Sequence, residues 1–110
     1  SNYMNKEIII NLIDREGIKH KLIAPLDVNL NLMELFKSYE FPVDATCGGM
    51  AMCASCQCYV NSDHQLPEIS ESEEAMLAEA FNVKKNSRLS CQILINNRLD
   101  GLVITLAPAE

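Results

Sequence analysis

The stretch DATCGGMAMCASCQCYV, residues 44–60, contains four of the five cysteines of this 110-residue chain. The fifth, Cys91, stands alone far downstream. Two adjacent glycines, Gly48 and Gly49, separate the first two cysteines, and residues 43–55 show no hydrophobic periodicity, so we expect a loop there. Four thiols in and beside a glycine-containing loop are hard to explain by core packing alone, which makes this stretch the starting point for both fold and function.

The length and composition indicate one globular domain. We expect residues 4–110 to form it, and residues 1–3, which precede Met4, to be partly an expression remnant. Apolar residues make up 48% and charged residues 22%, which are ordinary values for a folded domain. Because we find neither a signal peptide nor an apolar run long enough for a bilayer, we expect a cytoplasmic protein without membrane contact. Clustered thiols in that setting are more typical of metal ligands or redox groups than of disulfides, and their odd number agrees.

The net charge of the chain limits the kinds of partner that we expect it to bind. The chain has 15 acidic and 9 basic residues and a formal net charge of −6. Nucleic-acid binding requires a basic footprint, so we expect no such partner. An acidic surface favours basic protein partners, or it only keeps the protein soluble.

Hydrophobic patterns predict the element order ββαβαββ, a mixed α+β arrangement. The predicted strands are residues 6–13, 18–24, 56–60, 87–95 and 99–106, and the predicted helices are residues 31–41 and 69–81. Both helices begin with the pattern of a capping box, formed by Asn31 with Glu34 and by Ser70 with Glu73. Pro42 follows the first helix and is expected to end it.

The second predicted helix has two contrasting faces. Its apolar stripe is assigned to the core and consists of Met76, Leu77, Ala80 and Phe81. The opposite face presents Glu71, Glu74 and Glu79, and no basic residue lies between residues 68 and 79. The negative charges of Glu71 and Glu73 interact favourably with the positive N-terminal end of the helix dipole. This accounts for two of the five acidic residues between residues 68 and 79. Glu74 and Glu79 are then either solvated charge or part of a docking surface.

Four interpretations compete for the cysteines. A thioredoxin-like dithiol would need only Cys53 and Cys56, and it would leave the others unexplained. A structural zinc site is usually built from two short knuckles, but Cys91 has no nearby Cys or His. The two histidines suggest no site, because His20 lies on an alternating strand and His64 is expected to be solvated in a loop. Buried apolar thiols are the general alternative.

An iron–sulfur cluster accounts for all the features together. Such a cluster needs four thiolates, and backbone that passes close to it without side-chain clashes. The spacing is Cys47-x5-Cys53-x2-Cys56, followed by Cys91 after 34 intervening residues. The plant-type spacing has four residues in the first gap, whereas this chain has five.

With that gap, the chain resembles the adrenodoxin and putidaredoxin family of 2Fe–2S ferredoxins from about residue 4 to residue 106. The segments CGGMAMCASCQCYVN and NSRLSCQI carry the resemblance, together with LDGLVITL. The resemblance implies a β-grasp fold and cluster ligands at Cys47, Cys53, Cys56 and Cys91. It also implies that Cys58 is a buried strand residue and not a ligand. The cysteine spacing alone would still allow Cys58 to replace one of the four as a ligand.

The resemblance also implies the activity and the partners. It implies a one-electron carrier rather than an enzyme, reduced by a flavin-containing NAD(P)H-dependent ferredoxin reductase. The implied acceptor is a haem-thiolate (cytochrome) monooxygenase, or alternatively the iron–sulfur cluster assembly machinery. We expect a monomer that docks through Glu71, Glu74 and Glu79. A non-redox structural metal domain serving as an interaction module is the competing hypothesis from another class.

The chain departs from its relatives at positions that concern the partner. Vertebrate members carry acids where this chain has Ala75 and Ala78, and putidaredoxin has an acid where this chain has Thr46. Gln57 stands where the family often has histidine, and the chain ends in APAE rather than in an aromatic residue. These differences leave the cluster unaffected, but they argue against copying a particular monooxygenase partner from a relative.

Overall fold

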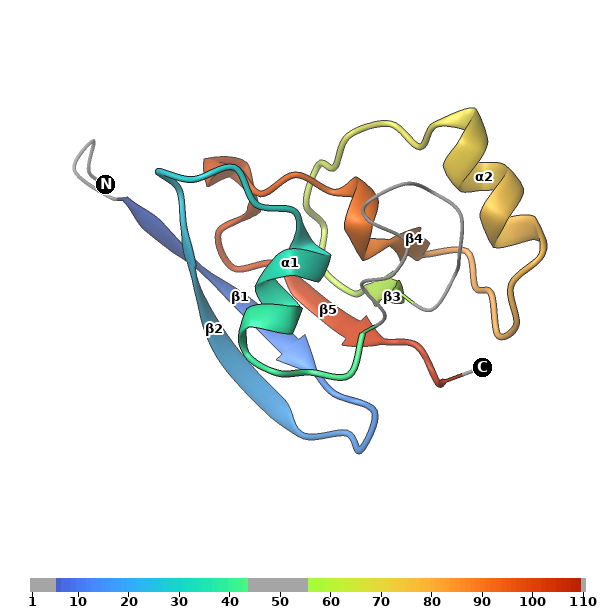
Figure 1. Cartoon of the computed structure of the whole chain (residues 1–110), viewed down its shortest axis with the longest axis horizontal. Helices are drawn as coiled ribbons and strands as arrows, with labels where there is room; N and C mark the ends of the chain where they lie inside the picture. The colour runs from blue at the N-terminus through green and yellow to red at the C-terminus, as the bar shows by residue number, and fades with distance from the viewer. Residues whose placement is uncertain (1–5, 44–55, 110) are drawn as a thin grey trace.

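The computed structural model describes residues 6–43 and 56–109 of the chain. The first element in this part of the chain is an antiparallel hairpin (Figure 1). Its strands β1 (Glu7–Ile13) and β2 (Lys19–Pro25) pair over seven residues each, as the alternating patterns predicted. Gly17 in the connecting turn has φ +84°, a left-handed conformation that glycine adopts readily.

Asp14 organises this turn. Its Oδ1 accepts hydrogen bonds from the backbone N–H groups of Glu16 and Ile18, both at 2.9 Å, and its Oδ2 lies 2.7 Å from Nε2 of His20. The bond to His20 is the largest cause that lowers the pKa of Asp14, and the Ile18 N–H adds to it. His20, expected to be one polar strand residue among several, therefore has a specific partner that its alternation pattern did not indicate.

The other strands complete one mixed five-stranded sheet in the order β2-β1-β5-β3-β4. These are β3 (Gln57–Val60), β4 (Ser87–Leu89) and β5 (Val103–Leu106). Strand β5 runs parallel to β1, and all other neighbouring strands are antiparallel. Helices α1 (Leu32–Ser38) and α2 (Glu71–Ala78) complete the predicted ββαβαββ order. In Figure 1, α2 lies at the β4 end of the molecule.

The predicted strand 87–95 is wrong beyond Leu89. The chain instead forms a short 3₁₀ helix, η1 (Ser90–Gln92). Ser90 still donates its N–H to the carbonyl oxygen of Cys56 at 3.0 Å, in register with the pairing of β3 and β4. Beyond it the chain turns, because the Ile93 carbonyl accepts from the Leu32 N–H at 3.0 Å and the Ile95 N–H donates to the Leu30 carbonyl at 2.8 Å, so the segment pairs with the start of α1 instead of with β3. The last predicted strand also starts later, at Val103, after a second 3₁₀ helix, η2 (Asn97–Leu99).

The first helix begins as predicted and ends earlier. The capping box is present: Asn31 accepts from the Glu34 N–H at 2.8 Å, and Glu34 accepts from the Asn31 N–H at 2.9 Å. The helix ends at Ser38, and Glu40 takes φ 67°, a left-handed conformation that is uncommon outside glycine. The chain has therefore already left the helix before it reaches Pro42.

Two expectations for the second helix are wrong. Ser70 caps the N-terminus by accepting from the Glu73 N–H at 3.1 Å, but the Glu73 carboxylate is 1% exposed and bonds to Arg88 instead of closing a capping box. Phe81, expected in the core, has 66% of its surface exposed because the helix ends at Ala78 and the chain turns away. Leu77 of the predicted stripe is buried, with Met76 and Ala80 partly buried.

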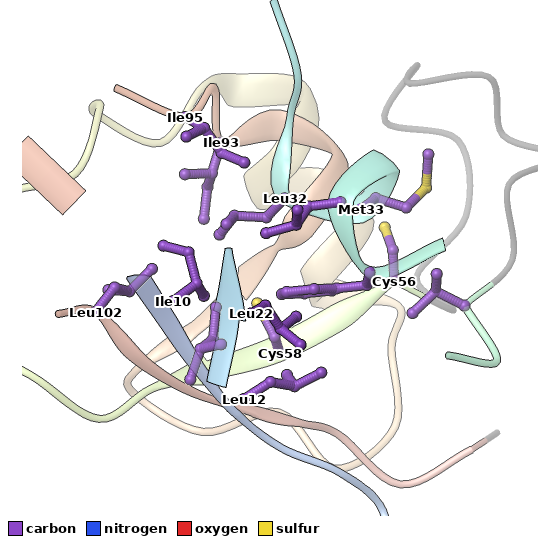
Figure 2. Close-up of a cluster of buried hydrophobic side chains, with 14 of the residues drawn as sticks. Ile10, Leu12, Leu22, Leu32, Met33, Cys56, Cys58, Ile93, Ile95 and Leu102 are labelled. Atoms are coloured by element: carbon purple, nitrogen blue, oxygen red, sulfur yellow. The ribbon is translucent and has the colours of Figure 1, made fainter. Parts of the chain in front are cut away.

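The core lies between the sheet and α1. Alternate residues of β1 are buried, and α1 contributes four buried side chains on its inner face. In Figure 2 the side chain of Leu32 on α1 lies beside that of Ile93, from the segment after η1, and Ile95 belongs to the same cluster. Cys56 and Cys58 belong to the same cluster. The residues Cys56 and Cys58 are therefore held in the close-packed hydrophobic core.

Candidate metal centre

Cys56 and Cys91 are brought together from segments 35 residues apart. Their Sγ atoms lie 3.4 Å apart, and the two residues are 0% and 5% exposed. This separation is too long for a disulfide, in which the sulfurs are about 2.05 Å apart. It is close to that of two thiolates on one tetrahedral metal ion, where bonds of about 2.3 Å place neighbouring sulfurs about 3.8 Å apart. The pair therefore fits the ligand geometry of a metal centre.

Ser90 holds these two cysteines in register. Its two hydrogen bonds to the Cys56 carbonyl join the end of the cysteine-rich stretch to the residue immediately before Cys91. Ser90 is 0% exposed, so water cannot replace either bond. The backbone of Cys56 is therefore fixed relative to the residue next to Cys91 by two hydrogen bonds, one from the main chain and one from the side chain of Ser90.

Ser90→Ala is expected to lower the free energy of unfolding by about 1 kcal/mol, because one buried hydrogen bond to the Cys56 carbonyl is lost. For a domain of this size the thermal midpoint should fall by roughly 4–8 °C. Ser38→Ala is the matched control, since its hydroxyl also donates to a carbonyl, that of Leu35, but at an exposed helix end. Equal midpoints for the two variants, measured by circular dichroism, would contradict the role given to Ser90.

Cys58 lies in a different environment. It is 0% exposed within the core, and its thiol donates to the carbonyl oxygen of Arg88 at 3.4 Å. Burial raises the pKa of this thiol strongly. Cys58 is thus a buried strand residue whose thiol is hydrogen-bonded, as the family resemblance led us to expect.

The described residues contain half of the expected donor set. Cys47 and Cys53, with Thr46, Gly48 and Gly49, lie outside them. Among the described side chains, no group of three or more His, Cys, Asp or Glu gathers in a way that could hold a metal ion. The buried thiol pair therefore fits a centre that takes further ligands from the rest of the cysteine-rich stretch, and it fits no separate site made of described residues.

Neither histidine joins the thiols. His64, expected to be solvated, is half-buried and has both ring nitrogens in hydrogen bonds. Nδ1 lies 2.8 Å from the Ser62 hydroxyl, and Nε2 lies 2.8 Å from the Asp100 carbonyl oxygen. The expectation of a solvated side chain is therefore wrong, because the loop folds back onto the turn before β5.

Gln57 connects the cysteine-rich stretch to the segment after α2. Its Nε2 donates to the Phe81 carbonyl at 2.9 Å, and its Oε1 accepts from the Ser87 hydroxyl at 2.7 Å. It is 2% exposed. The residue that follows Cys56 is therefore fixed by the segment that carries the exposed Phe81.

Glu73 connects α2 to the segment that carries Cys91. Its carboxylate accepts from Nε and Nη2 of Arg88 at 2.8 and 3.1 Å and from the Leu89 N–H at 2.8 Å. Arg88 also donates through Nη1 to the Pro67 carbonyl at 2.9 Å. This arrangement couples the position of α2 to the backbone two residues before Cys91. The sequence assigned Glu73 to a local cap, and no local pattern points to a partner fifteen residues away.

The outer face of α2 is acidic and exposed, as predicted. Glu71, Glu74 and Glu79 are all exposed, and so are Ala75 and Ala78 on the same outer surface. Glu79 is the C-cap of the helix. We call this set of three glutamates the acidic face.

Comparison with known proteins identifies the class. Residues 18–96 match the 2Fe-2S iron-sulfur cluster binding domain family. The chain is 35% identical to "Ferredoxin-2, mitochondrial" of Danio rerio, covering 92% of this chain but 53% of that protein, so it spans about half of that relative. It is 34% identical to rhodocoxin of Rhodococcus erythropolis, covering 88% of this chain and 92% of that protein. A solved structure, the covalent putidaredoxin reductase–putidaredoxin complex, contains a chain matched at TM-score 0.80 and 33% identity, covering 93% and 99% of the two chains.

The chain therefore belongs to the 2Fe-2S iron-sulfur cluster binding domain family. Within it, the relatives are ferredoxins of the adrenodoxin and putidaredoxin type, so the predicted family, β-grasp fold and 2Fe–2S cofactor are confirmed. The protein is an electron carrier and not an enzyme. No described helix has the length and apolar character needed to cross a membrane.

Proposed function

We propose that this ferredoxin receives electrons from a flavin-containing NAD(P)H-dependent ferredoxin reductase and passes them, one at a time, to a monooxygenase of the cytochrome type. Likeness to a putidaredoxin solved in covalent complex with its reductase supports the donor. A bound 2Fe–2S cluster supplies a one-electron couple and forms no bond to a substrate. The protein's own part is to hold that couple near the surface and to present a surface on which a partner can dock. We further propose that residues 4–110 form the single domain that does so.

The proposed ligands are Cys47, Cys53, Cys56 and Cys91. The observation that carries this proposal is the buried pair of Cys56 and Cys91, whose sulfurs lie 3.4 Å apart. The hydrogen bond from Cys58 to a backbone carbonyl supports its exclusion from the set. Soft thiolate ligands favour iron–sulfur clusters, and the described residues place no competing imidazole beside the pair.

The proposed docking surface is the acidic face. Its three exposed glutamates belong to a segment, residues 68–79, that contains no basic residue, and the exposed Phe81 follows shortly after the helix. Several carboxylates on one surface suit a partner with a basic surface, and an exposed aromatic side chain near the end of the same helix suits an apolar contact. Glu73 is buried and paired with Arg88, so it does not contribute to the surface. Its contacts instead link the docking helix to the segment before Cys91.

Replacing Glu71, Glu74 and Glu79 together by glutamine is expected to lower the association rate with reduced putidaredoxin reductase about tenfold at low ionic strength, because charge steering is lost. Near 1 M salt, where the screening length falls to about 3 Å, the difference should disappear. Stopped-flow absorbance at several salt concentrations measures this rate.

A second triple variant serves as the matched control, because it removes the same number of negative charges from another part of the surface. Glu7, Glu16 and Glu40 are also exposed and lie outside α2, so their replacement by glutamine should change the rate much less. Equal losses for both triple variants would show that total charge matters and would contradict a docking surface on α2. Electron transfer to cluster-assembly proteins, without transfer to any monooxygenase, would replace the proposed acceptor and leave the carrier role intact.

A further inference from the structure

Gln92 makes a contact that neither the fold nor the docking role requires. It is the last residue of η1, and its side-chain Nε2 donates to Sγ of the adjacent Cys91 at 3.4 Å. The side chain is half-buried, so this bond is partly shielded from water. A contact between a carboxamide and a proposed ligand sulfur bears on the electronic properties of the centre.

We infer that Gln92 raises the reduction potential of the centre by donating a hydrogen bond to the Cys91 sulfur. This inference rests on the proposed function, in which Cys91 is a ligand. It assigns Gln92 the part of a tuning residue that acts through Cys91 and makes no contact with a partner.

The direction follows from charge. A ligand thiolate can only accept hydrogen bonds, and a carboxamide nitrogen can only donate them, so the pair is matched in polarity. Reduction adds one negative charge, part of which falls on the ligand sulfurs, and the N–H group stabilises the more negative state to a greater extent. Removing the donor must therefore favour the oxidised form.

The surrounding contacts keep the amide in place. The Ile93 N–H closes η1 by donating to the Ser90 carbonyl at 3.4 Å, and Ser90 is itself tied to Cys56. Ile93, immediately after Gln92, is 0% exposed and belongs to the core. Gln92 thus stands on a turn anchored at both ends, which limits how far the amide can move away from the sulfur.

The test is the reduction potential of the purified holoprotein, measured by spectroelectrochemical titration. For Gln92→Leu, which keeps similar bulk without a donor, we expect the reduced-to-oxidised ratio at a fixed applied potential to fall roughly threefold to tenfold. A tenfold fall corresponds to about 59 mV for one electron. Gln65→Leu is the matched control, because Gln65 is exposed and lies in the segment before α2. The reduction potential of this variant should equal that of the wild type.

The outcomes are separable. A Gln92→Leu protein with a normal visible spectrum and an unshifted potential overturns the inference and leaves the proposed ligands untouched, whereas a wild-type protein without a cluster overturns the proposed function. If the leucine variant fails to hold the cluster, Gln92→Glu carries the test, and its carboxylate should lower the ratio further than leucine would. Loss of the chromophore in both variants would assign Gln92 a structural role and would also overturn the inference.

Discussion

Cys91→Ser is expected to abolish the visible absorption of the protein, whereas Cys58→Ser is expected to retain it. The Cys91 sulfur faces that of Cys56 at 3.4 Å, and a serine oxygen is a poor substitute for a soft thiolate in an iron–sulfur site. The Cys58 thiol instead donates to the Arg88 carbonyl, a bond that a serine hydroxyl can also make. Absorption spectra and the iron content per chain measure both effects.

The two variants control for each other, because each makes the same change at a buried cysteine. Circular dichroism should show that both proteins remain folded, so that loss of colour reports ligation and not unfolding. A colourless Cys58→Ser protein beside a coloured Cys91→Ser protein would exchange the roles proposed for the two residues. The same substitution at Cys47, Cys53 or Cys56 should behave as it does at Cys91.

Glu73→Ala is expected to destabilise the fold by about 3 kcal/mol, because removing one partner of a buried ion pair leaves the other uncompensated. Arg88 would lose two hydrogen bonds and the Leu89 N–H would lose its acceptor. The thermal midpoint should fall by about 12 °C or more. Thermal unfolding followed by both circular dichroism and visible absorbance measures the change, and the colour should be lost together with the fold.

Glu74→Ala provides the matched control on the same helix, because Glu74 is exposed and should change the midpoint little. A Glu73→Ala midpoint equal to that of Glu74→Ala would mean that the pair with Arg88 contributes no stability. That result would contradict the proposal that Glu73 couples the position of α2 to the segment that carries Cys91.

Local patterns in the sequence predicted the elements whose causes are local. Asn31 and Ser70 are the N-caps because each offers a side-chain acceptor to an N–H three residues on, and spacing alone reveals this. The hairpin of β1 and β2 follows from alternation around a glycine turn. The acidic face of α2 follows from helical periodicity.

The errors arose where a distant contact overrides a local preference. The segment after Leu89 has the residues of a strand, but Ile93 and Ile95 form backbone hydrogen bonds with the start of α1 instead of with β3, so the chain turns through η1. Glu73 has capping-box spacing, yet the partly buried Arg88 and the backbone N–H of Leu89 on β4 offer it stronger partners. Phe81 continues an apolar stripe, but the helix has already ended.

The cysteine spacing, read with the family resemblance, predicted the centre but not the polar contacts around it. Ser90 and Gln92 are two polar residues that flank Cys91 within an otherwise apolar run. This interruption of the apolar run is the sequence feature from which their polar contacts could have been predicted. Gln57, directly after Cys56, is a similar case. Polar residues beside a candidate ligand are the usual source of its outer hydrogen bonds.

The central claim is that this chain is a one-electron carrier built on a 2Fe–2S cluster. Its most direct test is a redox titration of the purified protein, followed by visible absorbance, with iron and sulfide measured on the same sample. We expect two irons and two acid-labile sulfides per chain, and a visible spectrum that bleaches and recovers reversibly with the slope of a single electron. A correctly folded protein that is colourless and free of iron, or that holds one redox-inactive metal ion such as zinc, would contradict the claim.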